Sequence, residues 1–133
     1  DLNLQTSIIL VWVKNNHVMA RTDYLPKHEF IVYGWKGKHK FYGESPKSVF
    51  FYDKPHINDL HPTMNPIELM ADIIKNASKR EMSIYDPFGG SGTTLIACEQ
   101  TNRKCFMMEI DPIYCSVIIE RWEKFTNKIA VKL

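Results

Sequence analysis

Residues 83–95 constrain the fold of this chain more than any other segment. They read SIYDPFGGSGTTL, a short apolar run followed by a glycine-rich turn and a helix-like segment, which predicts a strand, a tight turn and a helix N-terminus. At such a junction, backbone N–H groups approach a ligand closely and the helix dipole favours a negative group. A second apolar run, residues 105–108, ends in Glu109 about twenty residues after Gly89, where a carboxylate can accept hydrogen bonds from ribose hydroxyls.

Three kinds of nucleoside-containing ligand bind at turns of this type: dinucleotides, nucleoside triphosphates and sulfonium nucleosides. The dinucleotide pattern G-x-G-x-x-G fails, because Leu95 stands where its third glycine belongs. The phosphate-binding pattern G-x-x-x-x-G-K-[ST] also fails, because no lysine lies between Gly89 and Gln100. Asp86 would repel a phosphate but suits an ammonium group. The residues therefore favour S-adenosylmethionine (AdoMet), which carries an ammonium, a carboxylate, a sulfonium and a ribose; a purely structural turn is the alternative that they leave open.

A proline-containing segment precedes the glycine turn. It reads HPTMNP over residues 61–66 and leads into a stretch with apolar residues at helical spacing. Pro66 suits the first helical position, where its missing N–H costs nothing. Thr63 can cap this helix or donate its hydroxyl to a ligand carboxylate.

Three segments, in this order, resemble motifs of the amino-group DNA methyltransferases, which methylate adenine N6 or cytosine N4. They are HPT-x-x-P at residues 61–66, DPFGGSGTT at residues 86–94 and EIDP at residues 109–112. The resemblance covers nearly the whole chain, and the order matches the subgroup whose catalytic motif precedes the AdoMet motifs. It implies a partial, Rossmann-like α/β fold with a mostly parallel sheet, AdoMet as cofactor, double-stranded DNA as substrate of the full-length parent, and a restriction–modification or phage origin.

The resemblance also implies roles for individual residues. Those assigned to AdoMet are Asp86, Phe88, Gly89, Gly90 and Ser91 at the methionine end, Glu109 at the ribose, and His61 and Thr63 over the pocket. Asn65 departs from the family pattern, which usually has a lysine there that can pair with the AdoMet carboxylate. Because a neutral amide offers only a hydrogen bond, we expect Asn65→Lys to tighten AdoMet binding.

The catalytic motif of the family, Asp/Asn/Ser-Pro-Pro-aromatic, does not occur in this sequence. In the family it accepts hydrogen bonds from the base amino group and stacks on a base flipped out of the duplex. The nearest match, DPIY at residues 111–114, lacks the second proline and directly follows Glu109 and Ile110, so it belongs to the ribose-binding corner. We therefore interpret the chain as the C-terminal portion of a longer enzyme, and we expect AdoMet binding but no methyl transfer from this chain alone.

Two other functions stay open at this point: an AdoMet enzyme acting on RNA, protein or a small molecule, and a remnant that keeps the fold without transfer chemistry. The HPT motif and a basic–aromatic segment favour the DNA methyltransferase, with adenine N6 preferred to cytosine N4 on family frequency only. In that segment Lys36, Lys38 and Lys40 stand among aromatic residues, a pattern suited to holding phosphates and stacking on bases. A solvated hairpin with inward aromatics is its plainer interpretation.

Composition narrows the class further. The 133 residues are 44% hydrophobic with a net charge of +2, which suits one compact core and does not by itself indicate nucleic-acid binding. Three cysteines without C-x-x-C spacing and five scattered histidines indicate buried free thiols in a reducing compartment and no metal site. No apolar run is long enough to span a bilayer and no signal peptide is visible, so the sequence predicts a cytoplasmic protein.

The expected layout is one truncated domain over residues 1–133, with a candidate DNA-contacting region at 14–60 and an AdoMet-binding region at 61–125. Strands are expected at residues 7–13, 29–35, 40–42, 83–85 and 105–109, the second and third forming a hairpin around Gly37, with a short extended piece at 49–52. Helices are expected at residues 66–77, 92–101 and 112–125, the last with Ile113, Val117, Ile118 and Trp122 on one face. An incomplete sheet exposes unpaired edges, so we expect a dimer or higher oligomer.

Overall fold

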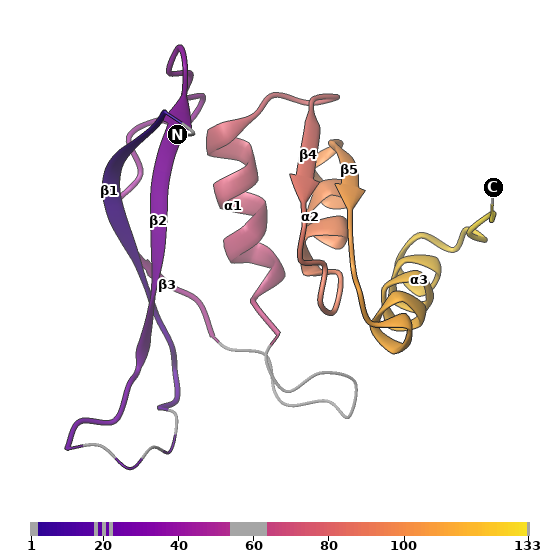
Figure 1. Ribbon diagram of the computed structural model, residues 1–133, viewed down its shortest axis with the longest axis horizontal. Helices are drawn as coiled ribbons and strands as arrows, with labels where there is room; N and C mark the ends of the chain where they lie inside the picture. Colours follow the sequence, from indigo (N-terminus) through magenta and orange to yellow (C-terminus); the bar gives the residue numbers. More distant parts are fainter. Residues whose placement is uncertain (1–2, 18, 20, 22, 54–63, 133) are drawn as a thin grey trace.

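Figure 1 shows a computed structural model of the chain, which describes residues 3–17, 19, 21, 23–53 and 64–132. The strands form two sheets, ordered β2-β1-β3 and β4-β5, and helix α1 lies between them. The elements are β1 (Leu4–Val13), β2 (His28–Lys36), β3 (Val49–Phe51), α1 (Ile67–Ala77), β4 (Ser83–Asp86), α2 (Thr93–Thr101), β5 (Lys104–Met107) and α3 (Pro112–Thr126).

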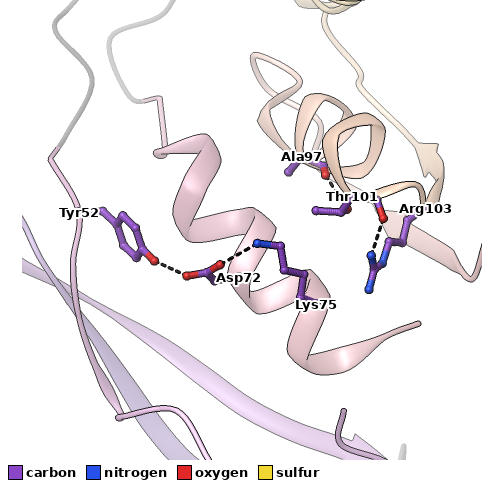
Figure 2. Close-up of polar contacts among 6 residues, drawn as sticks. All are labelled: Tyr52, Asp72, Lys75, Ala97, Thr101 and Arg103. Carbon is purple, nitrogen blue, oxygen red and sulfur yellow. Dashed lines mark hydrogen bonds and ion pairs between the residues drawn. The ribbon is translucent and has the colours of Figure 1, made fainter. Parts of the chain in front are cut away.

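Strand β1 is the central strand of the larger sheet, as its unbroken apolar sequence predicts. It pairs antiparallel with β2 and parallel with β3. Tyr52, just beyond β3, joins this sheet to α1, because its hydroxyl donates a hydrogen bond to Asp72 Oδ2 while Lys75 pairs with Asp72 Oδ1 at 3.2 Å (Figure 2). The indole of Trp12, on β1, also donates to the Tyr52 carbonyl at 2.8 Å.

The predicted hairpin around Gly37 is wrong. Residues 29–35 do lie in β2, but residues 40–42 form no strand, because β2 pairs with the longer apolar strand β1. The segment after Gly37 instead folds back over side chains of β2. The His39 ring lies 4.2 Å from the Trp35 ring, and His39 Nε2 and the Tyr33 hydroxyl are hydrogen-bonded at 2.9 Å.

The second sheet is close to its predicted form. Strands β4 and β5 are parallel, and Ile84 and Cys105 face a core formed by Ala71, Ile74, Ala97 and Cys98. Helix α2 ends at the predicted Asn102, whose left-handed backbone lets its N–H bond to two carbonyls of the last turn. The carboxyl ends of β4 and β5 therefore lie side by side, which is where open α/β sheets bind ligands.

Helix α3 begins after Asp111, whose carboxylate accepts a hydrogen bond from the Ile113 N–H at 2.8 Å. Ile113 and Ile118, two of the residues expected on one face of this helix, differ in burial. Ile113 is 71% exposed while Ile118 is 9% exposed, because only the later turns of α3 lie against α2 and the glycine turn. Trp122 confirms this docking, since its indole N–H donates to Glu99 of α2 at 2.8 Å.

The three cysteines are free, as predicted. Cys98 is buried, whereas Cys105 and Cys115 are half-buried, so the prediction of full burial holds for one of them. Burial raises the pKa of Cys98, and it raises the pKa of Cys105 to about 12. Such thiols stay protonated at neutral pH and are poor nucleophiles.

Candidate functional site at the carboxyl ends of two parallel strands

The glycine turn carries the chain from the end of β4 into α2. Asp86 closes the strand, and its Oδ1 accepts a hydrogen bond from the Phe88 N–H at 3.0 Å. Gly92 caps α2 with φ +80°, a left-handed conformation that favours glycine, and its N–H donates to the Gly89 carbonyl at 2.8 Å. A Cβ on Gly89 would come within 2.7 Å of the Met107 side chain, so a larger residue here would force that side chain to shift.

The carboxylate of Glu109 joins the end of β5 to this turn. Strand β5 ends at Met107, two residues before the predicted end, and Glu109 follows in the loop that leads to α3. Its Oε2 accepts a hydrogen bond from the Gly90 N–H at 2.7 Å, and its Oε1 accepts from the N–H groups of Ile110 and Asp111 at 2.8 and 3.0 Å. The acid predicted from spacing thus lies at the glycine turn, engaged with backbone donors.

A cleft of about 230 Å³ opens beside the turn. Its lining residues are Asn65, Met70, Asp86, Phe88, Gly89, Gly90, Ser91, Thr93 and Thr94. Six of the sequence-predicted site residues are among them, so the structure brings together the start of α1, the end of β4 and the start of α2. Glu109 is not part of this lining, and the predicted residues His61 and Thr63 lie outside the described residues.

Three lining residues were not predicted from the sequence. Met70 faces the turn from the first turns of α1, and Thr93 and Thr94 stand at the N-terminus of α2. The sequence could have indicated the two threonines as site residues, because both directly follow Gly92, the last glycine of the turn. The Thr93 hydroxyl donates to the Asn65 carbonyl at 3.5 Å, which links α2 to the segment that enters α1.

The cleft combines groups of opposite preference. The carboxylate of Asp86 suits a cation, whereas the α2 N-terminus and the hydroxyls of Ser91 and Thr93 suit an anion. The Phe88 ring is 86% exposed and offers an apolar contact at the rim. Among the described residues, no three side chains of His, Cys, Asp or Glu are grouped to hold a metal ion. The chemistry of the donor set therefore fits a small ligand with separate positive and negative groups.

The three predicted DNA-contacting lysines, Lys36, Lys38 and Lys40, lie at the other end of the fold. Lys36 pairs with Leu4 at the end of β2, and soon afterwards the Tyr42 N–H donates to the Asn76 carbonyl at the C-terminal end of α1. The cleft lies at the opposite, N-terminal end of α1, and this 11-residue helix spans roughly 16 Å. Figure 1 shows the same separation between the end of β2 and the turn after β4.

The fold and the site together define an α/β domain of the AdoMet-dependent methyltransferase type. The chain belongs to the DNA methylase family of N6/N4 type, whose family model matches residues 2–120. Among curated relatives, the type II methyltransferase M.HpaI of Haemophilus parainfluenzae is 24% identical over 96% of this chain and 48% of its own length. The orphan methyltransferase M.BamHII of Bacillus amyloliquefaciens is 37% identical over 49% of this chain and 24% of its own length.

Solved structures give the same result. M1.HpyAVI, crystallised as a complex with SAM, is 28% identical, with a TM-score of 0.76 over 90% of this chain and 63% of its own chain. The cytosine-N4-specific PvuII DNA methyltransferase is 18% identical with a TM-score of 0.76 over 90% of this chain and 54% of its own, which shows the shared fold. The chain therefore spans about half of M.HpaI and of the PvuII enzyme, and less than two thirds of M1.HpyAVI.

Proposed function

We propose that this chain binds AdoMet in the cleft beside the glycine turn and forms the cofactor-binding portion of an amino-group DNA methyltransferase. The observation that carries the proposal is the convergence of six sequence-predicted residues on one cleft at the carboxyl end of β4. Membership of the N6/N4 DNA methylase family supports it, as does the likeness to M1.HpyAVI, a protein solved with SAM.

The residues present fit AdoMet. Asp86 would hold the ammonium group, while Ser91, Thr93 and the start of α2 would hold the carboxylate. Glu109, beside Gly90, would take the ribose hydroxyls. Gly89 and Gly90 line the cleft with backbone alone, so no side chain of theirs would stand between the turn and the ligand. When bound, AdoMet supplies an electrophilic methyl group on its sulfonium.

Double-stranded DNA is the proposed substrate of the whole enzyme, with an exocyclic base amino group as methyl acceptor and adenine N6 preferred to cytosine N4. This chain lacks the motif that would hold the base, so we propose that it binds the cofactor without transferring the methyl group.

Three lysines stay predicted phosphate contacts: Lys36, Lys38 and Lys40. Because they lie about one helix length from the cleft, they would meet the duplex away from the target base.

Because DNA is the proposed substrate, we predict that the enzyme acts in the cytoplasm. In the described part of the chain, no helix combines the length and the apolar character that crossing a membrane requires. The alternative of an AdoMet enzyme with a different substrate finds no separate support in the site, whereas Asn65 in place of the usual lysine favours the alternative of a remnant with weakened cofactor binding.

Calorimetric titration of the protein with AdoMet tests the proposal. We expect saturable binding of one AdoMet per chain and no heat from ATP or NAD. Asp86→Asn should weaken binding about tenfold, because it removes the charge opposite the ammonium but keeps an acceptor for the Phe88 N–H. Glu81→Gln, an exposed change at the far end of β4, is the matched control. Absence of AdoMet binding by the unmodified protein would overturn the proposal.

A radiolabel assay separates binding from transfer. We expect no tritium to pass from AdoMet to DNA with this chain alone. The reason is that its sequence contains no Asp/Asn/Ser-Pro-Pro-aromatic motif to hold the target base. Label incorporated into adenine or cytosine would show that transfer chemistry resides in these 133 residues, and it would contradict the binding-only part of the proposal.

A further inference from the structure

Helix α3 contacts the glycine turn through a charged side chain. Arg121 Nη1 donates a hydrogen bond to the carbonyl oxygen of Ser91, thirty residues earlier in the sequence. Arg121 is half-buried, and burial lowers its pKa. The ion pairs found among the described residues, Lys14–Glu29 and Lys75–Asp72, do not include it. Burying part of a guanidinium without an opposite charge beside it costs free energy. The bond to the turn therefore suggests that Arg121 has a role at that carbonyl.

The bond from Arg121 fixes one particular peptide group. The peptide between Ser91 and Gly92 has its carbonyl bonded to Arg121 and its N–H bonded to the Gly89 carbonyl at 2.8 Å. Gly92 is the N-cap residue of α2, with φ +80°, so this peptide joins the turn to the first turn of the helix. A flip of this peptide would break both bonds. One of the two bonds that hold this part of the turn therefore comes from a side chain of α3.

The same helix also supplies an apolar contact to the turn. A Cβ built on Gly89 would lie 3.1 Å from Ile118 Cδ1, and one built on Gly92 would lie 3.2 Å from Ile118 Cγ1. One turn later, Trp122 donates to Glu99 of α2 and fixes α3 against that helix. Ile118 thus packs against Gly89 and Gly92 of the turn, while Arg121 donates to the Ser91 carbonyl between them.

We propose that Arg121 is the positioning residue of the AdoMet-binding turn, acting through the Ser91–Gly92 peptide without contacting AdoMet. The inference rests on the proposed function. Arg121 does not line the cleft, whereas Ser91 does, so its effect passes through the backbone. A planar guanidinium that stays charged at any physiological pH holds a carbonyl in one direction better than the flexible ammonium of lysine.

Titration calorimetry with AdoMet tests this on Arg121→Ala, Arg121→Lys and the control Lys124→Ala, an exposed change on the same helix. We expect about tenfold weaker binding for Arg121→Ala, because a charged hydrogen bond is lost, and a smaller loss for Arg121→Lys. Methylguanidinium added to Arg121→Ala should restore part of the affinity, which would show that the guanidinium group, and not the rest of the side chain, sets the affinity. Unchanged affinity in Arg121→Ala, or an affinity that methylguanidinium leaves unrestored, would overturn the inference.

A ligand-free measurement separates this inference from the proposed function. In amide nuclear magnetic resonance spectra, Arg121→Ala should shift the N–H signals of Gly90 and Gly92, while Lys124→Ala should leave both in place. If the unmodified protein fails to bind AdoMet but these shifts occur, the proposed function fails and the positioning role of Arg121 stands. If AdoMet binds but neither signal moves in Arg121→Ala, the positioning role is wrong.

Discussion

The carboxylate of Glu109 accepts a hydrogen bond from the backbone N–H of Gly90 at 2.7 Å, across the tips of two parallel strands. The same carboxylate accepts the N–H groups of Ile110 and Asp111, so the group predicted to hold the ribose is already engaged with the protein. A carboxylate has about four lone-pair sites. At least three of these sites accept backbone N–H groups, so two ribose hydroxyls would have to share what remains or displace the Gly90 N–H. Displacement would couple ligand binding to the conformation of the turn.

Glu109→Gln tests this coupling. The substitution removes the charge and places an amide N–H beside backbone donors, so we expect AdoMet affinity to fall at least tenfold and the free energy of unfolding to fall by about 2 kcal/mol. Titration calorimetry and urea unfolding measure the two effects, with Glu120→Gln as an exposed control on α3. If Glu109→Gln binds AdoMet as tightly as the unmodified protein, the ribose role of Glu109 is wrong.

Asn65→Lys should strengthen AdoMet binding. Asn65 is exposed and lines the cleft, and its described hydrogen bond uses the backbone carbonyl, so the side chain can change without losing that bond. An added ammonium opposite the ligand carboxylate gives an exposed ion pair, for which we expect about threefold tighter binding that weakens at high salt. Asn16→Lys adds the same charge elsewhere on the surface. Equal affinity in Asn65→Lys and Asn16→Lys would remove this position from the site.

Asp111 is a helix cap, which explains the DPIY sequence without base chemistry. Its carboxylate accepts the Ile113 N–H at 2.8 Å, and Pro112 stands in the first turn of α3. We expect Asp111→Ala to reduce the free energy of unfolding by about 1 kcal/mol while AdoMet affinity stays within twofold of the unmodified value. Asp111→Asn keeps a capping oxygen and should unfold at nearly the unmodified urea concentration. A stability loss in Asp111→Asn equal to that in Asp111→Ala would contradict the cap.

The hydrogen bond from the Tyr52 hydroxyl to Asp72 stabilises the folded protein, and this stabilisation is lost at alkaline pH. The hydrogen bond to Asp72 is the main cause that raises the pKa of Tyr52 from 10 to about 12, with burial and the charges of Asp72 and Glu68 adding to it. Because the folded pKa is raised, the stabilisation is complete below pH 10 and is lost as the pH rises towards 12.

Tyr52→Phe removes this stabilisation while Lys75 remains paired with Asp72. We expect the variant to be less stable by about 1 kcal/mol at pH 7, and the unfolding curves of the two proteins to converge between pH 10 and 12. Urea unfolding across this pH range measures the difference. A stability difference that stays constant up to pH 12 would show that the hydrogen bond to Asp72 does not set the pKa of Tyr52.

Local sequence signals predicted the part of the fold that holds the site. β4, the glycine turn, α2 and β5 lie within two residues of their expected bounds, because an apolar run, glycines at left-handed positions and Asn102 each act on their own neighbourhood. The false strand at residues 40–42 has the opposite origin. Whether β2 pairs with that short segment or with β1 depends on a long-range competition, which the longer apolar strand wins.

The site itself shows the same limit. Spacing placed Glu109 near the glycine turn, but it could not show that the carboxylate bonds to the Gly90 N–H. Local spacing could not predict the bond from Arg121 to Ser91, because the bond spans thirty residues and depends on how α3 docks against α2. Ile113 fitted the helical pattern but is exposed, since periodicity identifies an apolar face without saying how much of it meets a neighbour.

Both sheets present an apolar face that no described residue covers. Ile9, Phe30 and Val32 are 54%, 66% and 68% exposed on neighbouring positions of β1 and β2, and Tyr85 and Phe106 are 62% and 57% exposed where β4 and β5 pair. On the alternate positions of β4 and β5, Ile84 and Cys105 face the core instead. Exposed faces and unpaired edges of this kind favour association between chains.

We therefore predict that the protein associates with itself at high concentration, and that Val32→Lys reduces this association. Sedimentation velocity over a range of concentrations should show dimers or larger species for the unmodified chain and for Glu81→Lys, an exposed change outside both faces. Val32→Lys places a charge at the centre of the β1–β2 face and should shift the distribution towards the monomer, because burying an unpaired ammonium in an interface is costly. A monomer at every concentration would contradict self-association, and association that Val32→Lys leaves unchanged would place the interface elsewhere.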